Sequence, residues 1–247
     1  MNKPLVSVVI PVYRALDYIE QTIQSVMSQE VDSEIIIVED KSDQLSTSII
    51  MRYKEKANIT YVENPKRLGV AANRNIGIDL ARGKYIAFLD ADDWWSDDKL
   101  KKQLKLIESK DTVLVYSGRE LMSHCGEPTG KKVSVPLVVD YNKLLRGNVI
   151  PASSVLLKSQ VAKEFPQHHD EFHEDYIMWL EILKKYGYGY GINEPMLKSR
   201  LSEGGKSRDK RKSALMTWEV YKLMNIGFLE RCYLFVCYSL KGVLKYI

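Results

Sequence analysis

Three carboxylates follow directly after a short apolar segment in this 247-residue chain. The segment 85–89 (YIAFL) is β-prone, and Asp90, Asp92 and Asp93 come immediately after it. In α/β proteins, ligand sites lie at the carboxyl ends of strands, where these carboxylates should be. Clustered carboxylates repel one another, and Mg²⁺ or Mn²⁺ bound by one or two of them, together with substrate phosphates, removes that repulsion. The alternative is a solvated acidic turn that leads into a helix capped by Ser96 or Asp97.

The residues before position 110 alternate between strand-like and helix-like segments. We expect strands at 6–10, 34–38, 59–62 and 85–89, and helices at 16–27, 47–56 and 71–81. This alternation predicts an α/β fold with a mostly parallel, Rossmann-like sheet flanked by helices. The ends of the first two strands, at Tyr13 and Asp40, should then lie beside Asp92 at one edge of the sheet. There Tyr13 could pack on a base, Asp40 accept a base N–H and Asp92 hold a metal, which suits a nucleoside diphosphate.

Four segments resemble the motifs of the family 2 inverting glycosyltransferases. They are residues 6–13 (VSVVIPVY), 38–42 (VEDKS), 69–77 (GVAANRNIG) and 89–93 (LDADD). Their order and spacing are similar to the family pattern over residues 5–95, and a weaker similarity continues to about residue 207. The resemblance implies the GT-A fold, a nucleotide-sugar donor, a divalent cation (Mn²⁺ or Mg²⁺) and inversion at the anomeric carbon. It is a resemblance in particular to bacterial enzymes that build surface polysaccharides.

The resemblance also implies which residues bind the donor. They are Pro11, Val12, Tyr13, Glu39, Asp40, Arg74, Asn75, Asp90, Ala91, Asp92, Arg200 and Lys206, with Asp90 and Asp92 also binding the metal. Two departures are Lys41, which stands where the family has a glycine, and Ser199, which replaces a tyrosine. Arg200 and Lys206 would hold the diphosphate, and a solvated basic loop is the alternative. Arg74 and Asn75 would face the nucleotide or tie their loop to the Asp90 turn, unless they form a solvated helix surface.

A second acidic motif lies in the later half, at His173-Glu174-Asp175-Tyr176, just before a helix expected over 176–186. By resemblance to the family's Glu-Asp motif, Asp175 is the catalytic base, and Glu174 and Trp179 contact the acceptor. A carboxylate near the acceptor hydroxyl can take its proton during attack, which contributes about 10²- to 10⁴-fold. The alternative is that both acids only stabilise a helix N-terminus. No histidine follows His173, so the histidine metal ligand of some relatives has no counterpart.

The pattern after residue 110 is looser. Strands are expected at 112–117 and 153–158, a polar loop at 124–132, and a helix stop at Gly187 that leads into a strand. We therefore expect a GT-A catalytic domain over residues 1–207, with a nucleotide-sugar half (1–110) and an acceptor half (111–207). A helical, basic extension would follow over residues 208–247.

Positive charge gathers near the end of the chain. Residues 196–247 hold 11 lysines and arginines against 4 acids, a net charge of +7, whereas the whole chain carries +4. Apolar residues recur at helical spacing at Leu229, Tyr233, Val236, Leu240, Val243, Leu244 and Ile247, with Arg231, Lys241 and Lys245 on the opposite face. This stripe predicts a helix that either docks on the catalytic core or lies on an anionic membrane. A lipid-linked acceptor favours the membrane, and with it a peripheral location on the cytoplasmic face.

The chain as a whole predicts an inverting glycosyltransferase that moves a sugar from a UDP-sugar to a hydroxyl of a glycan acceptor, itself lipid-linked. A nucleotidyltransferase also uses clustered acids and Mg²⁺, but the first strand lacks a Gly-rich triphosphate loop. A non-catalytic nucleotide-sugar-binding scaffold is the third alternative, and Asp92 and Asp175 argue against it. We expect no nucleic-acid partner, no membrane-spanning helix and, with three cysteines, a reducing compartment.

Overall fold

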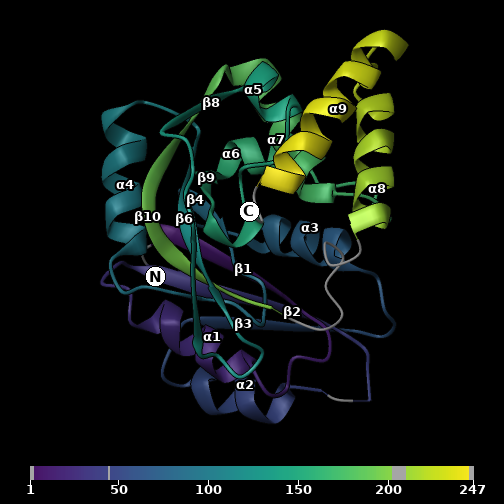
Figure 1. Ribbon diagram of the computed structural model, residues 1–247. Helices are drawn as coiled ribbons and strands as arrows, with labels where there is room; N and C mark the ends of the chain where they lie inside the picture. The colour runs from purple at the N-terminus through teal and green to yellow at the C-terminus, as the bar shows by residue number, and fades with distance from the viewer. Residues whose placement is uncertain (1–2, 44, 202–209, 245–247) are drawn as a thin grey trace.

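The computed structural model describes residues 3–43, 45–201 and 210–244. Within these ranges ten strands form one sheet, with helices on both of its faces (Figure 1). The strands are β1 (Val6–Val12), β2 (Ser33–Asp40), β3 (Ile59–Asn64), β4 (Tyr85–Phe88), β5 (Trp94–Trp95), β6 (Leu114–Met122), β7 (Pro128–Val133), β8 (Val138–Asp140), β9 (Leu156–Lys158) and β10 (Tyr188–Arg200). The helices are α1 (Ile19–Met27), α2 (Thr47–Lys54), α3 (Val70–Leu80), α4 (Lys99–Ser109), α5 (Tyr141–Leu145), α6 (Ser159–Glu164), α7 (Glu174–Tyr186), α8 (Lys210–Leu223) and α9 (Phe228–Leu244).

The sheet has the order β3-β2-β1-β4-β9-β6-β10-β5, with β7 beside β6 and β8 beside β10. The first four strands in this order are parallel neighbours, β9 runs antiparallel to both of its neighbours, and β6 and β10 are parallel. The predicted α/β fold with a mostly parallel sheet is therefore confirmed. Val12 pairs with Glu39 and Phe88 pairs with Val9, so the turn after β4 lies alongside the last residues of β1.

The inner strands are apolar on both sides because both faces of the sheet are covered by helices. All seven residues of β1 are buried. Val8 and Ile10 pack in one cluster with α1, α2 and α4, whereas Val9 packs in a second cluster with α3 and the later helices. Successive strand residues point to opposite faces, which explains why these strands read as continuous apolar runs rather than alternating ones.

One expected loop is a strand in the structure. The segment 124–132, expected as a polar loop, contains most of β7, which pairs with β6 at Arg119–Val133 and Met122–Pro128. Its side chains are almost all exposed, so the strand is held by backbone hydrogen bonds and shows no apolar alternation. Gly187 ends α7 at φ 87°, as predicted, and the strand that follows continues as far as Arg200.

The last two helices pack on the catalytic core. Val220 and Tyr221 of α8, Met224 directly after it and Leu234 of α9 belong to the same buried cluster as α7. Arg231, expected on a cationic outer face, instead lies over the Trp218 ring of α8 at 5.3 Å, so this part of the cationic face is turned inward. None of the described helices combines the length and the apolar character that crossing a bilayer requires. The sheet continues across residue 110 and the 207/208 boundary lies outside the described residues, so the domain division stays a prediction.

Candidate active site

The edge where β1 ends presents an aromatic side chain. Pro11 and Val12 are buried in β1, and Tyr13, the next residue, is partly exposed. The Arg67 guanidinium lies 4.2 Å from the centre of the Tyr13 ring, and that of Arg14 lies 5.5 Å away. Such stacking of a cation on an aromatic face is favourable. Tyr13 is thus placed where a base could pack, next to the end of β2.

The two acids at the end of β2 bind the protein itself. Glu39 is fully buried and accepts hydrogen bonds from the Ser46 amide and the Tyr61 hydroxyl, both at 2.8 Å. This arrangement differs from the expected donor contact, because Glu39 stabilises the start of α2. Asp40 is also buried, and it accepts bonds from the Asn64 side chain at 3.0 Å and from the Gly69 amide at 2.9 Å. A contact from Asp40 to a base stays a prediction.

Gly69, at the start of α3, lies unusually close to Asp170. Its φ is 97°, and a Cβ atom there would approach Asp170 Oδ2 to 2.4 Å. The same carboxylate accepts a hydrogen bond at 3.1 Å from the Ala71 amide, one of the unpaired N–H groups at the helix start. A glycine is therefore required at this position, and it fixes α3 against the loop before α7. Asp170 is distant in sequence and belongs to none of the four motifs.

The turn Asp90–Asp93 is held from several elements. Its backbone is bound by the Ser153 hydroxyl, which accepts from the Asp90 amide at 3.1 Å. Thr22 Oγ1 lies 2.8 Å from the carbonyl oxygens of both Ala91 and Asp93. Neither Thr22 nor Ser153 was predicted, because nothing in their local sequence marks them. Their contacts fix where the carboxylates of the turn lie.

Arg200, the last residue of β10, supports the same turn. Its guanidinium donates to the carbonyl oxygens of Asp92 (3.0 Å) and His124 (2.7 Å) and to Gln21 Oε1 (2.7 Å), and it lies between the rings of Tyr18 and Trp94. Its amide donates to Asp93 Oδ1 at 3.0 Å. The side chain is buried, so it holds the turn from behind and differs from the expected diphosphate contact. Lys206, the other expected diphosphate ligand, lies outside the described residues.

Arg74 joins the two acidic motifs. It is buried, and it donates to Asp90 Oδ1 at 2.7 Å and to the Oε1 atoms of Glu174 and Gln167, both at 3.1 Å. Burial alone would lower the Arg74 pKa, but the charges of Asp90 and Glu174 outweigh it and raise that pKa. Of the expected alternatives, the structure shows the tie to the Asp90 turn. The Asn75 side chain completes this tie, because it donates to the Gln167 carbonyl oxygen at 2.7 Å and accepts from the Gln167 amide at 2.8 Å.

Asp175 lies in the first turn of α7, directly after Glu174. Burial raises its pKa to about 6, the neighbouring Glu174 charge adds to this, and Arg74 and His173 act in the opposite direction. A carboxyl with this pKa is ionised at neutral pH yet basic enough to accept a proton. Trp179, expected to contact an acceptor, is instead fully buried with its ring 6.2 Å from that of Phe88, so it lies behind the site.

The turn has the chemistry of a divalent-cation site that substrate phosphates complete. Asp90 is partly exposed, at 39% of its side chain, and Asp92 is partly exposed too. Burial, with a smaller contribution from the charges of Asp92 and Asp90, raises the pKa of Asp93. Among the described residues, no group of three or more histidine, cysteine or acidic side chains could hold a metal. One or two carboxylates plus phosphates is a usual Mg²⁺ arrangement, so the residues fit such an ion.

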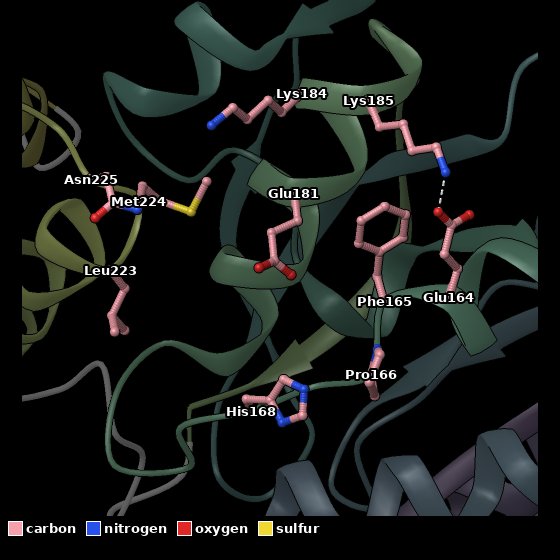
Figure 2. A pocket seen from close by; sticks show the side chains of 10 residues that line it. All are labelled: Glu164, Phe165, Pro166, His168, Glu181, Lys184, Lys185, Leu223, Met224 and Asn225. Carbon is pink, nitrogen blue, oxygen red and sulfur yellow. Dashed lines mark hydrogen bonds and ion pairs between the residues drawn. The ribbon is translucent and has the colours of Figure 1, made fainter.

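A separate hollow lies farther along α7, away from the predicted site residues. It encloses about 570 Å³ between α7, the segment 164–168 and the turn between α8 and α9. Figure 2 shows Glu181 at its centre, Lys184 and Asn225 on one side, and an ion pair of Lys185 with Glu164 on the other. Burial raises the Glu181 pKa. The hollow contains none of the predicted catalytic or donor-binding residues. The candidate active site is therefore the one at the ends of the strands.

The mostly parallel sheet, with acids at its strand ends and helices on both faces, has a GT-A-like fold. Its fold is similar to that of the mannosyltransferase PcManGT from Pyrobaculum calidifontis, solved in complex with GDP-Man and Mn²⁺. The TM-score is 0.71 at 18% sequence identity, covering 92% of this chain and 66% of that one. At this identity the likeness concerns the fold alone.

Sequence comparison gives the family. Residues 7–147 match Glycosyl transferase family 2. The chain is 34% identical over 248 residues to TuaG of Bacillus subtilis (strain 168), named for teichuronic acid biosynthesis, and covers 98% of each. It is 31% identical over 245 residues to Escherichia coli WfaP, a UDP-Glc:α-D-GlcNAc-diphosphoundecaprenol β-1,3-glucosyltransferase, covering 98% of this chain and 95% of that one. The chain therefore belongs to glycosyltransferase family 2.

Proposed function

We propose that this glycosyltransferase moves a sugar from a UDP-sugar to a hydroxyl of a lipid-linked glycan, with inversion at the anomeric carbon. The observation that carries the proposal is the Arg74 bridge. It joins Asp90, in the turn suited to a diphosphate, to Glu174, beside the basic carboxylate of Asp175. The donor's leaving group and the acceptor's base thus belong to one connected site. The name of WfaP, for donor and acceptor, and that of TuaG, for a surface polymer, support the substrate classes.

In the proposed reaction the acceptor hydroxyl attacks the anomeric carbon from the side opposite the diphosphate. The new C–O bond forms as the bond to the diphosphate oxygen breaks, and both electrons of that bond leave with UDP. The hydroxyl proton passes to Asp175, whose pKa of about 6 lets it accept the proton near neutral pH. A single displacement of this kind inverts the anomeric centre. Glu174 is held by Arg74, and it sets the electrostatic environment of the base.

We propose a metal-dependent enzyme in which Asp90 and Asp92 hold Mn²⁺ or Mg²⁺. The ion would stabilise negative charge on the leaving diphosphate. The partly exposed carboxylates of Asp90 and Asp92, both in the turn after β4, support this assignment. Tyr13 would pack on the base, with Pro11, Val12 and Ala91 forming the backbone edge around it. A lipid-linked acceptor also places the enzyme at the cytoplasmic face of a membrane.

The stereochemistry of the product tests the proposal. The protein is incubated with Mn²⁺, a panel of UDP-sugars and a synthetic sugar-diphosphate-lipid, and the product is analysed by NMR. A β-linkage formed from an α-linked donor supports inversion. An α-linkage from the same donor contradicts it, and sugar transfer without UDP release contradicts the reaction itself. The matched control is Asp175→Asn, which should release UDP at a strongly reduced rate.

A further inference from the structure

Helix α9 has two distinct apolar faces. One face docks on the protein through Leu234, which is 3% exposed, and through Phe235, whose ring lies 5.5 Å from that of Trp218 on α8. Tyr238 lies on the same side and shares a hydrogen bond of 3.2 Å with the Ser213 hydroxyl of α8. Residues four positions apart lie on one face of a helix, so Leu234 and Tyr238 define the docked side. The opposite face of α9 therefore does not take part in packing on the core.

The other face of α9 is apolar and exposed. Leu229, Tyr233 and Val236 are spaced i, i+4 and i+7, and their exposed fractions are 83%, 58% and 57%. Phe228, at the start of the helix, and Leu215, on the neighbouring α8, are exposed by 63% and 67%. Large apolar side chains that share one exposed helix face mark an interaction surface, whereas single exposed apolar residues do not. We name Leu229, Tyr233 and Val236 the outer patch, and Leu215 and Phe228 are further exposed apolar side chains of the same helix pair.

The position of the outer patch relates it to the active site. The hydrogen bond between Tyr238 and Ser213 places the later part of α9 beside the start of α8. Ser213 in turn binds His173, whose Nε2 lies 3.2 Å from the Ser213 carbonyl oxygen, and His173 directly precedes Glu174 and Asp175. The outer patch is therefore carried by helices that are fixed to the N-terminal end of α7. In Figure 1, α8 and α9 run side by side at one flank of the molecule.

Positive charge lies at the start of α8, beside the later part of α9. Arg211 and Lys212 are exposed in the first turn of α8. Residues 196–247 carry a net charge of +7, whereas the rest of the chain carries −3. A cationic segment beside an apolar helix face matches the surface of an anionic bilayer, where each lysine or arginine near the lipid headgroups contributes about 1 kcal/mol. A protein partner would need an apolar groove for the exposed side chains and a negatively charged surface beside that groove, whereas an anionic bilayer has both properties everywhere.

We propose that the outer patch inserts into the interfacial region of an anionic membrane and so presents the N-terminal end of α7 to a lipid-linked acceptor. The apolar side chains enter the boundary between headgroups and acyl chains, with Tyr233 suited to the headgroup level. Arg211 and Lys212 lie against the anionic headgroups. The choice of acceptor rests on the proposed function, but the membrane contact does not, because it can be measured without any donor or acceptor.

The test is flotation of the full chain with vesicles, without nucleotide or glycan. The vesicles contain phosphatidylcholine alone, or phosphatidylcholine with phosphatidylglycerol. The triple substitution Leu229→Gln, Tyr233→Gln and Val236→Gln should weaken partition into anionic vesicles by at least about tenfold, since three apolar side chains that would enter the membrane are lost. The matched control is Leu137→Gln, which changes a side chain that is 65% exposed but lies on the segment between β7 and β8. It should bind vesicles like the unmodified chain.

A second variant tests the charge. Arg211→Gln with Lys212→Gln should weaken binding to anionic vesicles by about tenfold or more and leave weak binding to phosphatidylcholine unchanged. Salt should weaken the anionic component, because surface charges are screened within about 8 Å at physiological ionic strength. Thermal unfolding checks that each variant is folded.

Three results would overturn the proposal. The first is equal binding of the triple variant and the unmodified chain, and the second is absence of vesicle binding by a folded chain. The third is a dimer in light scattering that the triple variant abolishes while vesicle binding persists, which would make the outer patch a contact between two copies. Failure of sugar transfer with intact vesicle binding would instead contradict only the proposed function.

Discussion

The turn after β4 and the outer face of α9 both present side chains to solvent, but the fold supports them differently. The turn is held by side chains from four separate elements, Thr22, Arg74, Ser153 and Arg200, each distant from it in sequence or on another element. The outer face of α9 follows from helical periodicity, and its side chains are mostly in solvent. Changes at the turn should therefore spread through the site, whereas changes on α9 should act locally.

The largest effect is expected at the turn itself. Asp92→Asn should abolish sugar transfer, because an amide lacks the charge that binds the metal beside the diphosphate. The measurement is UDP release with and without Mn²⁺. Thermal unfolding checks that the variant is folded. Full activity of the unmodified chain in excess chelator would refute the metal assignment.

The base should show the next largest effect. Asp175→Asn is expected to reduce kcat by roughly 10²-fold or more while the donor KM changes by only a few-fold, as for loss of a general base. In the unmodified chain, protonation of Asp175 should lower kcat as the pH falls through about 6. A variant that loses donor affinity but keeps its turnover would place Asp175 in the donor site instead.

Arg74 should affect the pH dependence of the reaction. Its charge lowers the Asp175 pKa, so Arg74→Met should move the acid limb of the kcat/KM profile to higher pH. Arg74→Lys retains a charge but not the two-pronged geometry that reaches Asp90 and Glu174. The Arg74→Lys variant should therefore keep the acid limb of the pH profile near its original position but have a reduced kcat. Equal pH profiles in all three proteins would show that Arg74 has no electrostatic role at the base.

Removal of Arg74 should also affect stability, because the buried carboxylate of Glu174 loses its ion pair with Arg74. Losses of about 3–5 kcal/mol are usual when one partner of a buried ion pair is removed. The lysine variant therefore serves as the folded reference for the pH profile, with thermal unfolding measured for both variants.

The smallest effect is expected on the outer face of α9. Leu229→Gln should change the free energy of unfolding by less than about 0.5 kcal/mol, as for most surface substitutions. Leu234→Ala, on the docked face of the same helix, should lower it by about 2–5 kcal/mol. Chemical denaturation of both variants measures the contrast. A large loss of stability in Leu229→Gln would show that the outer face packs on the protein.

Much of the fold was predictable because the inner strands are buried on both sides. The parallel strands β1 to β4, the edge where they end and the helix stop at Gly187 all follow from local patterns. The exposed strand β7 was missed because its backbone pairs while its side chains carry no apolar alternation. Edge strands of this kind have no periodic signal.

The candidate site was predictable only in part. Motifs indicated the acids, but not which of them the protein itself would bind. Glu39 and Arg200 are buried among partners that lie between 7 and 179 positions away. Gln167 and Asp170 stand in a loop without a motif, yet they hold Arg74 and the start of α3. Such support depends on distant contacts that single-sequence patterns do not encode.

The position of β9 has a consequence for synthesis on the ribosome. Strands β1 to β4 are complete by residue 88, but the free edge of β4 is covered only when β9 (Leu156–Lys158) emerges. At about 5–20 residues per second, the delay is roughly 4–14 s. During this interval a parallel, apolar, four-stranded unit exposes an unpaired edge, which is a template for pairing with other nascent chains. Chaperone demand should therefore be highest while residues 88 to 158 are being translated. At that stage the donor half and the acceptor half of the active site cannot yet come together.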